Sequence, residues 1–204
     1  MSATKANWIY RLLSKFVIPT LFFLFNVRIE NKERLNNWKS GIIATNHISY
    51  FDPPLIGGCL RHKVHFLAKK ELFEIPVLGF IIRKLYAIPI RRGVIDRKAL
   101  ENVSQLLTDG ENVLIFPEGS RKNFTAKPGI GMIAIKTGVP VLPILVENTD
   151  KSWQCLFRRK EMRVIVGEVI PAISDYSETK DDFRRYAENV LTTIKMLANE
   201  NSTR

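Results

Sequence analysis

A histidine and an aspartate lie five positions apart within residues 46–52, whose sequence is NHISYFD. A carboxylate can fix the tautomer of an imidazole and leave its other nitrogen free to accept a proton, so the pair is a candidate general base. The side chains can meet only if the chain turns sharply after the apolar run Gly41–Thr45. The two prolines after Asp52 favour such a turn, since Asp is a good N-cap and Pro a good first helical residue. Taken singly, His47 could be an ordinary loop histidine and Asp52 a helix cap.

A second group of polar residues follows the apolar run Val113–Phe116, which is typical of a buried strand that stops at a proline. The loop after it carries a carboxylate, a glycine, a hydroxyl and an arginine: Glu118, Gly119, Ser120 and Arg121. Glycine permits close backbone approach to a ligand, and a guanidinium offers a fork of donors to a phosphate or a carboxylate. The loop is therefore a candidate anion site, with a solvated arginine at a strand exit as the alternative.

Two further apolar runs are predicted to be strands. Ala87–Ile90 ends in the paired arginines Arg91 and Arg92, and either could contact an anion. The other run, Val139–Ile144, is interrupted by two prolines. In this order, the four runs resemble the motifs of the glycerolipid acyltransferase family, whose best-known members are 1-acyl-sn-glycerol-3-phosphate acyltransferases. The resemblance is most specific in residues 46–52 and 116–121.

The resemblance implies an enzyme that moves a fatty acyl group from an acyl thioester to the free sn-2 hydroxyl of 1-acyl-sn-glycerol-3-phosphate. The product would be phosphatidic acid, in phospholipid biosynthesis. The donor would be acyl-CoA or acyl carrier protein, consumed as a cosubstrate, and no cofactor or metal ion is expected. Acceptors such as glycerol-3-phosphate or another lysophospholipid remain open. A thioester hydrolase and a non-catalytic protein that binds anionic lipid are the alternatives from other classes.

The resemblance also assigns roles to individual residues. His47 would take the proton of the acceptor hydroxyl, and Asp52 would orient its ring and stabilise the charged form. The acceptor phosphate would be held by a set of four residues: Arg121, Arg92, Gly119 and Ser120. Glu118 would position either Arg121 or the acceptor. No covalent acyl-enzyme is needed, because the acceptor is itself the nucleophile.

Composition agrees with an α/β domain of one core: the chain has 204 residues, 46% of them hydrophobic. Cys59 and Cys155 show no disulfide or metal-ligand spacing, which favours a reducing compartment. The net charge is +11, and ten Lys or Arg against three acids lie between residues 61 and 98. Such a surface favours anionic partners, including lipid headgroups and an acyl donor, but no nucleic-acid-binding motif is present.

The N-terminal residues 1–26 are predicted to be a membrane-anchoring helical segment, and residues 27–204 the acyltransferase domain. The apolar part, Phe16–Phe25, is too short to span a bilayer, which takes about 20 apolar residues. Upstream aromatic and basic residues suit the headgroup region, so an interfacial helix is favoured over a spanning one. A signal peptide and a core helix are the alternatives. Membrane association is therefore expected to be monotopic or peripheral, with the active site facing the cytoplasm.

The elements that must position these residues alternate between strand and helix. Predicted strands occupy 27–30, 41–45, 64–68, 87–90, 112–116, 141–147 and 162–166, and predicted helices 53–60, 76–84, 96–107, 130–136 and 177–199. Alternation of this kind predicts a single αβ domain with a mixed, largely parallel sheet flanked by helices. The motif loops follow strands, and open αβ sheets bind ligands at the carboxyl ends of their strands.

Overall fold

One sheet organises the computed structural model, which describes residues 16–60, 62–91, 93–94, 96–121, 125–172 and 176–200, without the side chain of Glu200. Its strands are β1 (Val27–Glu30), β2 (Gly41–Thr45), β3 (Val64–Lys69), β4 (Ala87–Ile90), β5 (Asn112–Ile115), β6 (Val141–Glu147) and β7 (Met162–Val166). The order is β1-β7-β6-β2-β5-β3-β4. Neighbours are parallel except β6 and β7, which are antiparallel. The predicted α/β class and mixed, largely parallel sheet are confirmed.

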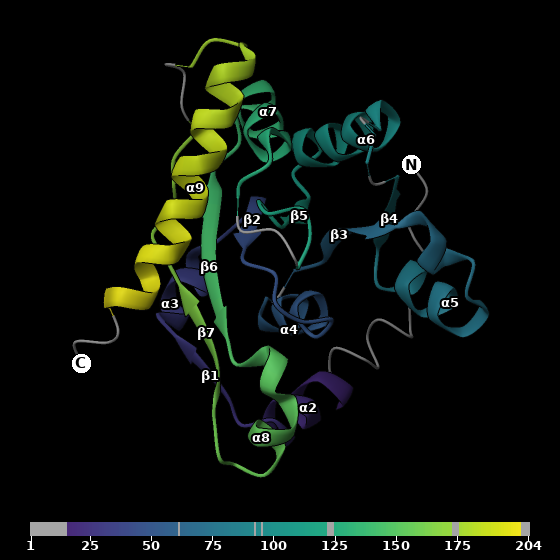
Figure 1. Cartoon of the computed structure of the whole chain (residues 1–204), viewed down its shortest axis with the longest axis vertical. Coiled ribbons are helices and arrows are strands. Elements are labelled where there is room, and N and C mark those ends of the chain that lie inside the picture. The colour runs from purple at the N-terminus through teal and green to yellow at the C-terminus, as the bar shows by residue number, and fades with distance from the viewer. Residues whose placement is uncertain are drawn as a thin grey trace.

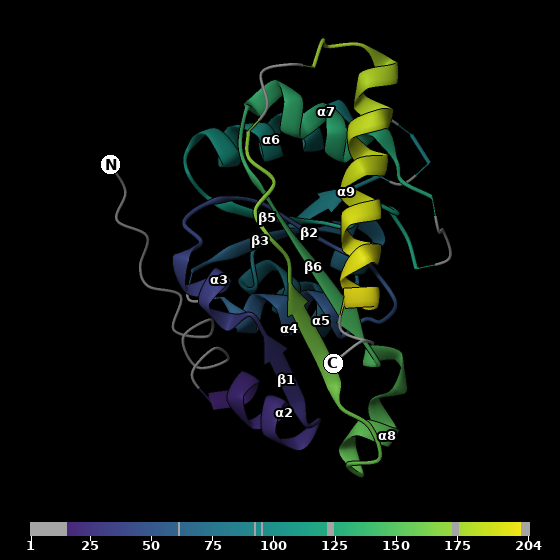
Figure 2. The same cartoon turned by 90° about the vertical axis from the view of Figure 1, so that its left-hand side faces the viewer.

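Helices of the described residues are α2 (Ile18–Leu24), α3 (Lys32–Asn37), α4 (Asp52–Cys59), α5 (Pro76–Lys84), α6 (Arg97–Thr108), α7 (Pro128–Thr137), α8 (Ser152–Leu156) and α9 (Lys180–Glu200). Short 3-10 turns, η2 (Lys70–Phe73) and η3 (Thr149–Lys151), follow β3 and β6. In Figures 1 and 2, α6 and α7 lie above the sheet, whereas α2 and α4 lie below it.

Successive side chains of the central strands pack into two separate hydrophobic cores, one on each face of the sheet. Ile42 of β2 and Val113 of β5 belong to the core covered by α6, α7 and α9. Their neighbours Ile43 and Leu114 belong to the opposite core, which is covered by α3 and α4. Successive residues of a strand point to opposite faces, so a strand buried on both faces is apolar throughout. This explains why the central motif strands are continuous apolar runs.

The described part of the N-terminal segment packs against α4. α2 begins at Ile18, one residue before Pro19, whose fixed φ suits the first turn of a helix. A Cβ on Gly58 of α4 would lie 2.2 Å from Ile18 Cγ2 and 3.2 Å from Phe22 Cζ, so only glycine permits this approach. The same glycine weakens α4 as an isolated helix. Its presence is therefore explained by the packing of α2.

The loops that carry the sequence motifs leave the sheet at one edge. β2, β5, β3 and β4 run parallel to one another, and β6 runs parallel to β2. Their carboxyl ends therefore lie on the same side of the sheet, where residues after β2, β5 and β6 can meet. This edge carries the candidate site.

Candidate active site

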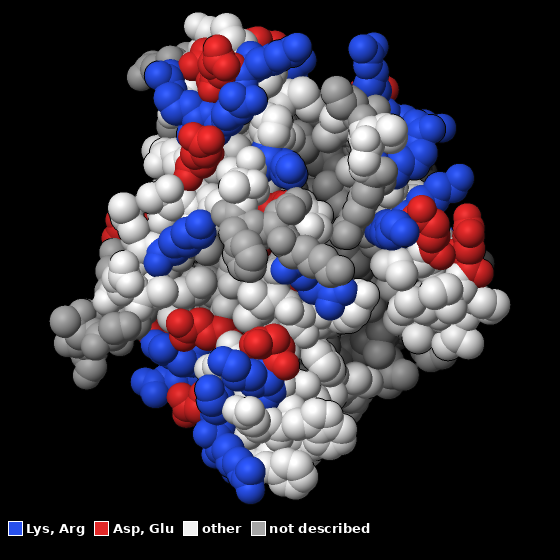
Figure 3. Space-filling view, in the orientation of Figure 1, with Lys and Arg blue, Asp and Glu red and all other residues white. Residues whose placement is uncertain are grey.

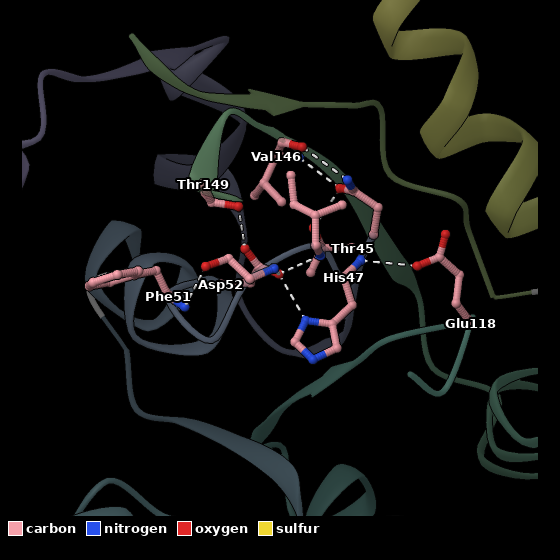
Figure 4. A network of polar contacts seen from close by, with 10 residues as sticks. Thr45, His47, Phe51, Asp52, Glu118, Val146 and Thr149 are labelled. Atoms are coloured by element: carbon pink, nitrogen blue, oxygen red, sulfur yellow. Dashed lines mark hydrogen bonds and ion pairs between the residues drawn. The ribbon is translucent and has the colours of Figure 1, made fainter. Parts of the chain in front are cut away.

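Asn46 fixes the direction of the chain where it leaves β2. Its side-chain amide donates to the carbonyl of Val146 in β6 at 2.9 Å and accepts from the Val146 N–H at 2.8 Å. The side chain thus pairs with the backbone of β6 as one more strand residue would, while the main chain turns away (Figure 4). His47 is thereby held at the carboxyl edge of the sheet.

His47 and Asp52 meet, as the sequence predicts. The ring Nδ1 lies 2.8 Å from Asp52 Oδ2. Oδ2 also accepts the backbone N–H groups of Ile48 and Ser49, each at 2.8 Å. The chain therefore wraps around the carboxylate, and this wrapping brings the five-residue spacing down to a hydrogen bond.

The N-cap role predicted for Asp52 is wrong. α4 begins at Asp52 itself, and its N-cap residue is Phe51, which makes no side-chain cap. The carboxylate turns back towards the preceding residues instead of bonding the next turn of the helix. A negative charge in the first turn still suits the helix dipole. Asp52 is therefore placed to bond His47 and not to cap α4.

The second carboxylate oxygen has a partner from a distant segment. The hydroxyl of Thr149, in the 3-10 turn after β6, donates to Asp52 Oδ1 at 2.6 Å. Both residues are fully buried. Asp52 thus accepts bonds on both oxygens, which fixes the plane of the carboxylate. Thr149 was not predicted from the sequence, because it lies 97 residues from Asp52 and follows no recognisable motif.

The geometry determines which ring nitrogen can act as a base. An ionised carboxylate only accepts hydrogen bonds, so Nδ1 carries the proton and Nε2 has the free lone pair. In Figure 4, Nε2 points away from Asp52. The ring stacks on Phe116 at a centroid distance of 4.0 Å, and its side chain keeps 9% of its surface exposed. The imidazole is therefore held from two sides, with its basic nitrogen directed away from the carboxylate.

Glu118 reaches the same segment from β5. Its carboxylate accepts the backbone N–H of His47 at 3.1 Å (Figure 4). Burial raises the pKa of Glu118, although the His47 N–H opposes that shift. The sequence predicts positioning of Arg121 or of the acceptor, and the bond to the His47 backbone was not foreseen. It ties the two motif loops together.

The loop after β5 brings its arginine beside the histidine motif. A turn places the N–H of Gly119 2.9 Å from the carbonyl of Phe116, and Gly119 adopts a φ of +68° that favours glycine. The guanidinium carbon of Arg121 lies 3.5 Å from the centroid of Tyr50, which is exposed. Ser120, which lies between Gly119 and Arg121 in the sequence, is half-buried. Arg121 therefore lies over residues 46–52 with its outer side open to an anion.

The predicted arginines after β4 have different outcomes. Arg92 lies outside the described residues, so its phosphate contact stays a prediction. The backbone N–H of Arg91 donates to Asp96 Oδ2 at 3.0 Å, and the side-chain Nε of Arg91 donates to the same oxygen at 3.2 Å. Both hydrogen bonds lower the pKa of Asp96. Arg91 also lines a cavity of about 390 Å³ together with Lys70 and Lys98. This cavity is cationic and lies at the ends of β3 and β4.

Together, these contacts form a candidate general-base site at the carboxyl edge of an α/β sheet. It offers an oriented imidazole for proton transfer and a guanidinium for an anionic group. Across the described ranges, no group of three or more His, Cys, Asp or Glu is placed to hold a metal ion. The chemistry that the site supports is activation of a hydroxyl or water.

Comparison with known proteins gives the family. A family model described as Acyltransferase matches residues 26–147, and the chain belongs to this family. It is 30% identical over 179 residues to a 1-acyl-sn-glycerol-3-phosphate acyltransferase of Bacillus subtilis, with 85% of this chain and 89% of that protein covered. A Streptococcus pneumoniae protein of the same name is 27% identical over 179 residues, with 86% and 67% covered.

A solved structure supports the same assignment. The crystal structure of the 1-acyl-sn-glycerophosphate (LPA) acyltransferase from Thermotoga maritima superposes with a TM-score of 0.71 at 27% identity. The match covers 100% of this chain and 84% of that one. The resemblance found in the sequence motifs is therefore confirmed over the whole fold.

Proposed function

We propose that this protein transfers a fatty acyl group from an acyl thioester to the sn-2 hydroxyl of 1-acyl-sn-glycerol-3-phosphate, which yields phosphatidic acid in phospholipid biosynthesis. The observation that carries the proposal is the 2.8 Å contact between His47 Nδ1 and Asp52, with Nε2 pointing away from the carboxylate. The names of the bacterial relatives support this choice of acceptor. Acyl-CoA or acyl carrier protein would be the donor.

The proposed mechanism uses His47 as the general base. Nε2 takes the proton of the acceptor hydroxyl, while Asp52 stabilises the imidazolium that forms. The acceptor oxygen attacks the thioester carbonyl and forms a tetrahedral intermediate. The intermediate collapses with cleavage of the carbon–sulfur bond, and the imidazolium returns its proton to the thiolate. The products are the new ester and the free thiol, with no acyl-enzyme.

The acceptor phosphate would bind at the loop after β5. Arg121 supplies a guanidinium above Tyr50, and Gly119 is exposed and allows the ligand near the backbone. Ser120 would add a hydroxyl donor, and Arg92 a second guanidinium. Glu118 would act chiefly on the position of His47, since it bonds the backbone there.

We also propose that the N-terminal segment 1–26 holds the enzyme at the membrane interface, with the active site facing the cytoplasm. In the part that the structure describes, Phe16 and Phe23 are exposed. No helix among the described residues is long and apolar enough to cross a bilayer. Interfacial binding through exposed apolar side chains fits a short helix of this kind. Lipid substrates would then reach the site without leaving the membrane.

The function is tested by measuring thiol release from an acyl thioester with and without lysophosphatidic acid. Transfer predicts release that depends on the acceptor and formation of phosphatidic acid in equal amount. Release without acceptor would indicate a hydrolase, and no release with either donor would indicate a lipid-binding protein. Glycerol-3-phosphate and other lysophospholipids serve as competing acceptors, and a clear preference for one of them would overturn the proposed substrate.

A further inference from the structure

The helix α5 presents apolar side chains to solvent. Val77, Phe80 and Ile81 follow a helical stripe on its outer side, and Val77 and Phe80 are 73% and 51% exposed. Ile75 and Leu78 flank this stripe and are exposed as well. These residues form the outer face of α5. This exposed face was not predicted from the sequence, which predicts only a helix at residues 76–84.

The inner side of α5 is already packed. Ile82 is buried in a small core with Phe73 of η2, and a Cβ on Gly79 would lie 2.3 Å from the carbonyl oxygen of Phe73. α5 is therefore seated on the turn before it and cannot rotate to bury its outer face. A helix that is apolar on both sides and covered on only one has a surface suited to a partner.

The surroundings of α5 indicate what this partner is. In Figure 1, α5 lies at the right-hand margin and α2 and α8 at the bottom, with α4 between them. Large apolar residues are also exposed on α2 and α8 and directly beside them: Phe16, Phe23, Trp153 and Phe157. In Figure 3, most of the surface over α5 is uncharged, with acidic and basic side chains above it. Apolar groups exposed on several separate elements fit the extended surface of a bilayer better than a single bound peptide.

Charge at the margins of α5 agrees with this partner. Residues 69–84 hold four cations and two acids. Arg83 and Lys84 lie at the end of the helix, and the Lys84 ammonium is 5.6 Å from the Phe80 centroid. Apolar residues bordered by Lys and Arg are the composition of surfaces that lie in the headgroup region of anionic bilayers.

We infer that the outer face of α5 inserts into the bilayer interface and forms a second membrane contact besides the N-terminal segment. The two contacts would lie on either side of α4, whose first residue is Asp52. The bilayer would therefore meet the protein on the side of α4. Contact at two places would fix the tilt of the enzyme relative to the membrane as well as attach it. The inference rests on the proposed function only in taking lipid as the partner.

The experiment measures binding of the full-length protein to vesicles of phosphatidylcholine and phosphatidylglycerol by cosedimentation. The variant is the double substitution Val77→Gln and Phe80→Gln, which removes exposed apolar groups and keeps good helix formers. We expect binding to weaken about tenfold or more, from the apolar area lost. Met196→Gln is the matched control, because Met196 is 55% exposed on α9, at the opposite core. It should bind as the parent protein does.

Other occupants of the outer face of α5 give different results. If residues 1–15 or a second copy of the chain covered it, the double variant would bind vesicles as well as the parent protein; in the second case, it would also change the sedimentation velocity of the free protein. Either result would overturn the inference. Vesicle binding requires no acyl donor, so it can succeed or fail independently of the proposed activity.

Discussion

Replacement of Asp52 by Asn separates the charge of the carboxylate from its geometry. In the structure, Oδ2 accepts three N–H groups and Oδ1 accepts the hydroxyl of Thr149. An asparagine can keep its oxygen towards the three donors and place its NH2 at Thr149. A threonine hydroxyl can rotate and accept that NH2 group. We therefore expect Asp52→Asn to keep the His47 tautomer and lose only the negative charge.

The magnitude follows from the charge that is lost. An imidazolium and a carboxylate with charge centres about 4 Å apart interact by about 4 kcal/mol at an effective dielectric constant of about 20. Only part of this charge develops in the transition state, so kcat/KM should fall roughly 100-fold to 1000-fold. In Asp52→Asn/Thr149→Val, the NH2 group loses its acceptor, but the three N–H donors still hold the amide oxygen. The His47 tautomer should therefore be kept, and kcat/KM of the double variant should fall no further than the product of the two single effects.

The assay is acceptor-dependent thiol release, with a thermal unfolding curve for each variant to show that it is folded. Phosphatidic acid formation is measured in parallel. If Asp52→Asn keeps its rate within about threefold of the parent, the carboxylate charge plays no part in catalysis. If the double variant falls much further than the product of the two single effects, Thr149 and not the three N–H donors fixes the orientation of residue 52. Each result would refute a separate step of the reasoning.

Three further predictions address neighbouring groups. Thr149→Val should lower the free energy of unfolding by about 1.5–3 kcal/mol, since a buried bond to a charged group is lost, whereas Thr149→Ser should recover most of it in chemical denaturation. Arg121→Lys keeps the charge but loses the fork and the stacking on Tyr50, so the KM for acceptor should rise more than kcat falls, as steady-state kinetics would show. Because burial raises the pKa of Glu118, its stabilising contribution is present below the usual carboxyl pKa and is lost as pH rises through the raised value. Glu118→Gln should therefore gain more in melting temperature, relative to the parent, at about pH 7 than at about pH 4; an equal shift at both values would contradict this.

The sequence predicts the sheet well because its strands are short apolar runs bounded by prolines and glycines. All of the predicted strands are present, and the bounds of Val27–Glu30 and Gly41–Thr45 agree fully. α3 was not predicted, because its six residues bury only Leu35 and show no helical repeat of apolar residues. α8 is five residues long, and its sequence shows no clearer helical pattern than that of α3. Short helices of this kind depend on tertiary contacts, which the local sequence does not reveal.

The candidate site likewise contains residues that the sequence predicts and residues that it does not. His47 and Asp52 were found because both lie in one local motif, and their contact is confirmed. Thr149 and the pairing of Asn46 with Val146 depend on β2 lying beside β6, which is a property of strand order. No local pattern carries that information. The phosphate-binding roles of Arg121 and Arg92, and the division at residue 26, stay predictions.

The most direct test of the central claim is the acceptor-dependent rate of His47→Ala at saturating acyl donor, with folding checked by thermal unfolding. A general base at Nε2 predicts a loss of roughly 100-fold to 10,000-fold with the donor still bound. A folded variant that transfers the acyl group at a near-parental rate would contradict the assignment of His47 as the base.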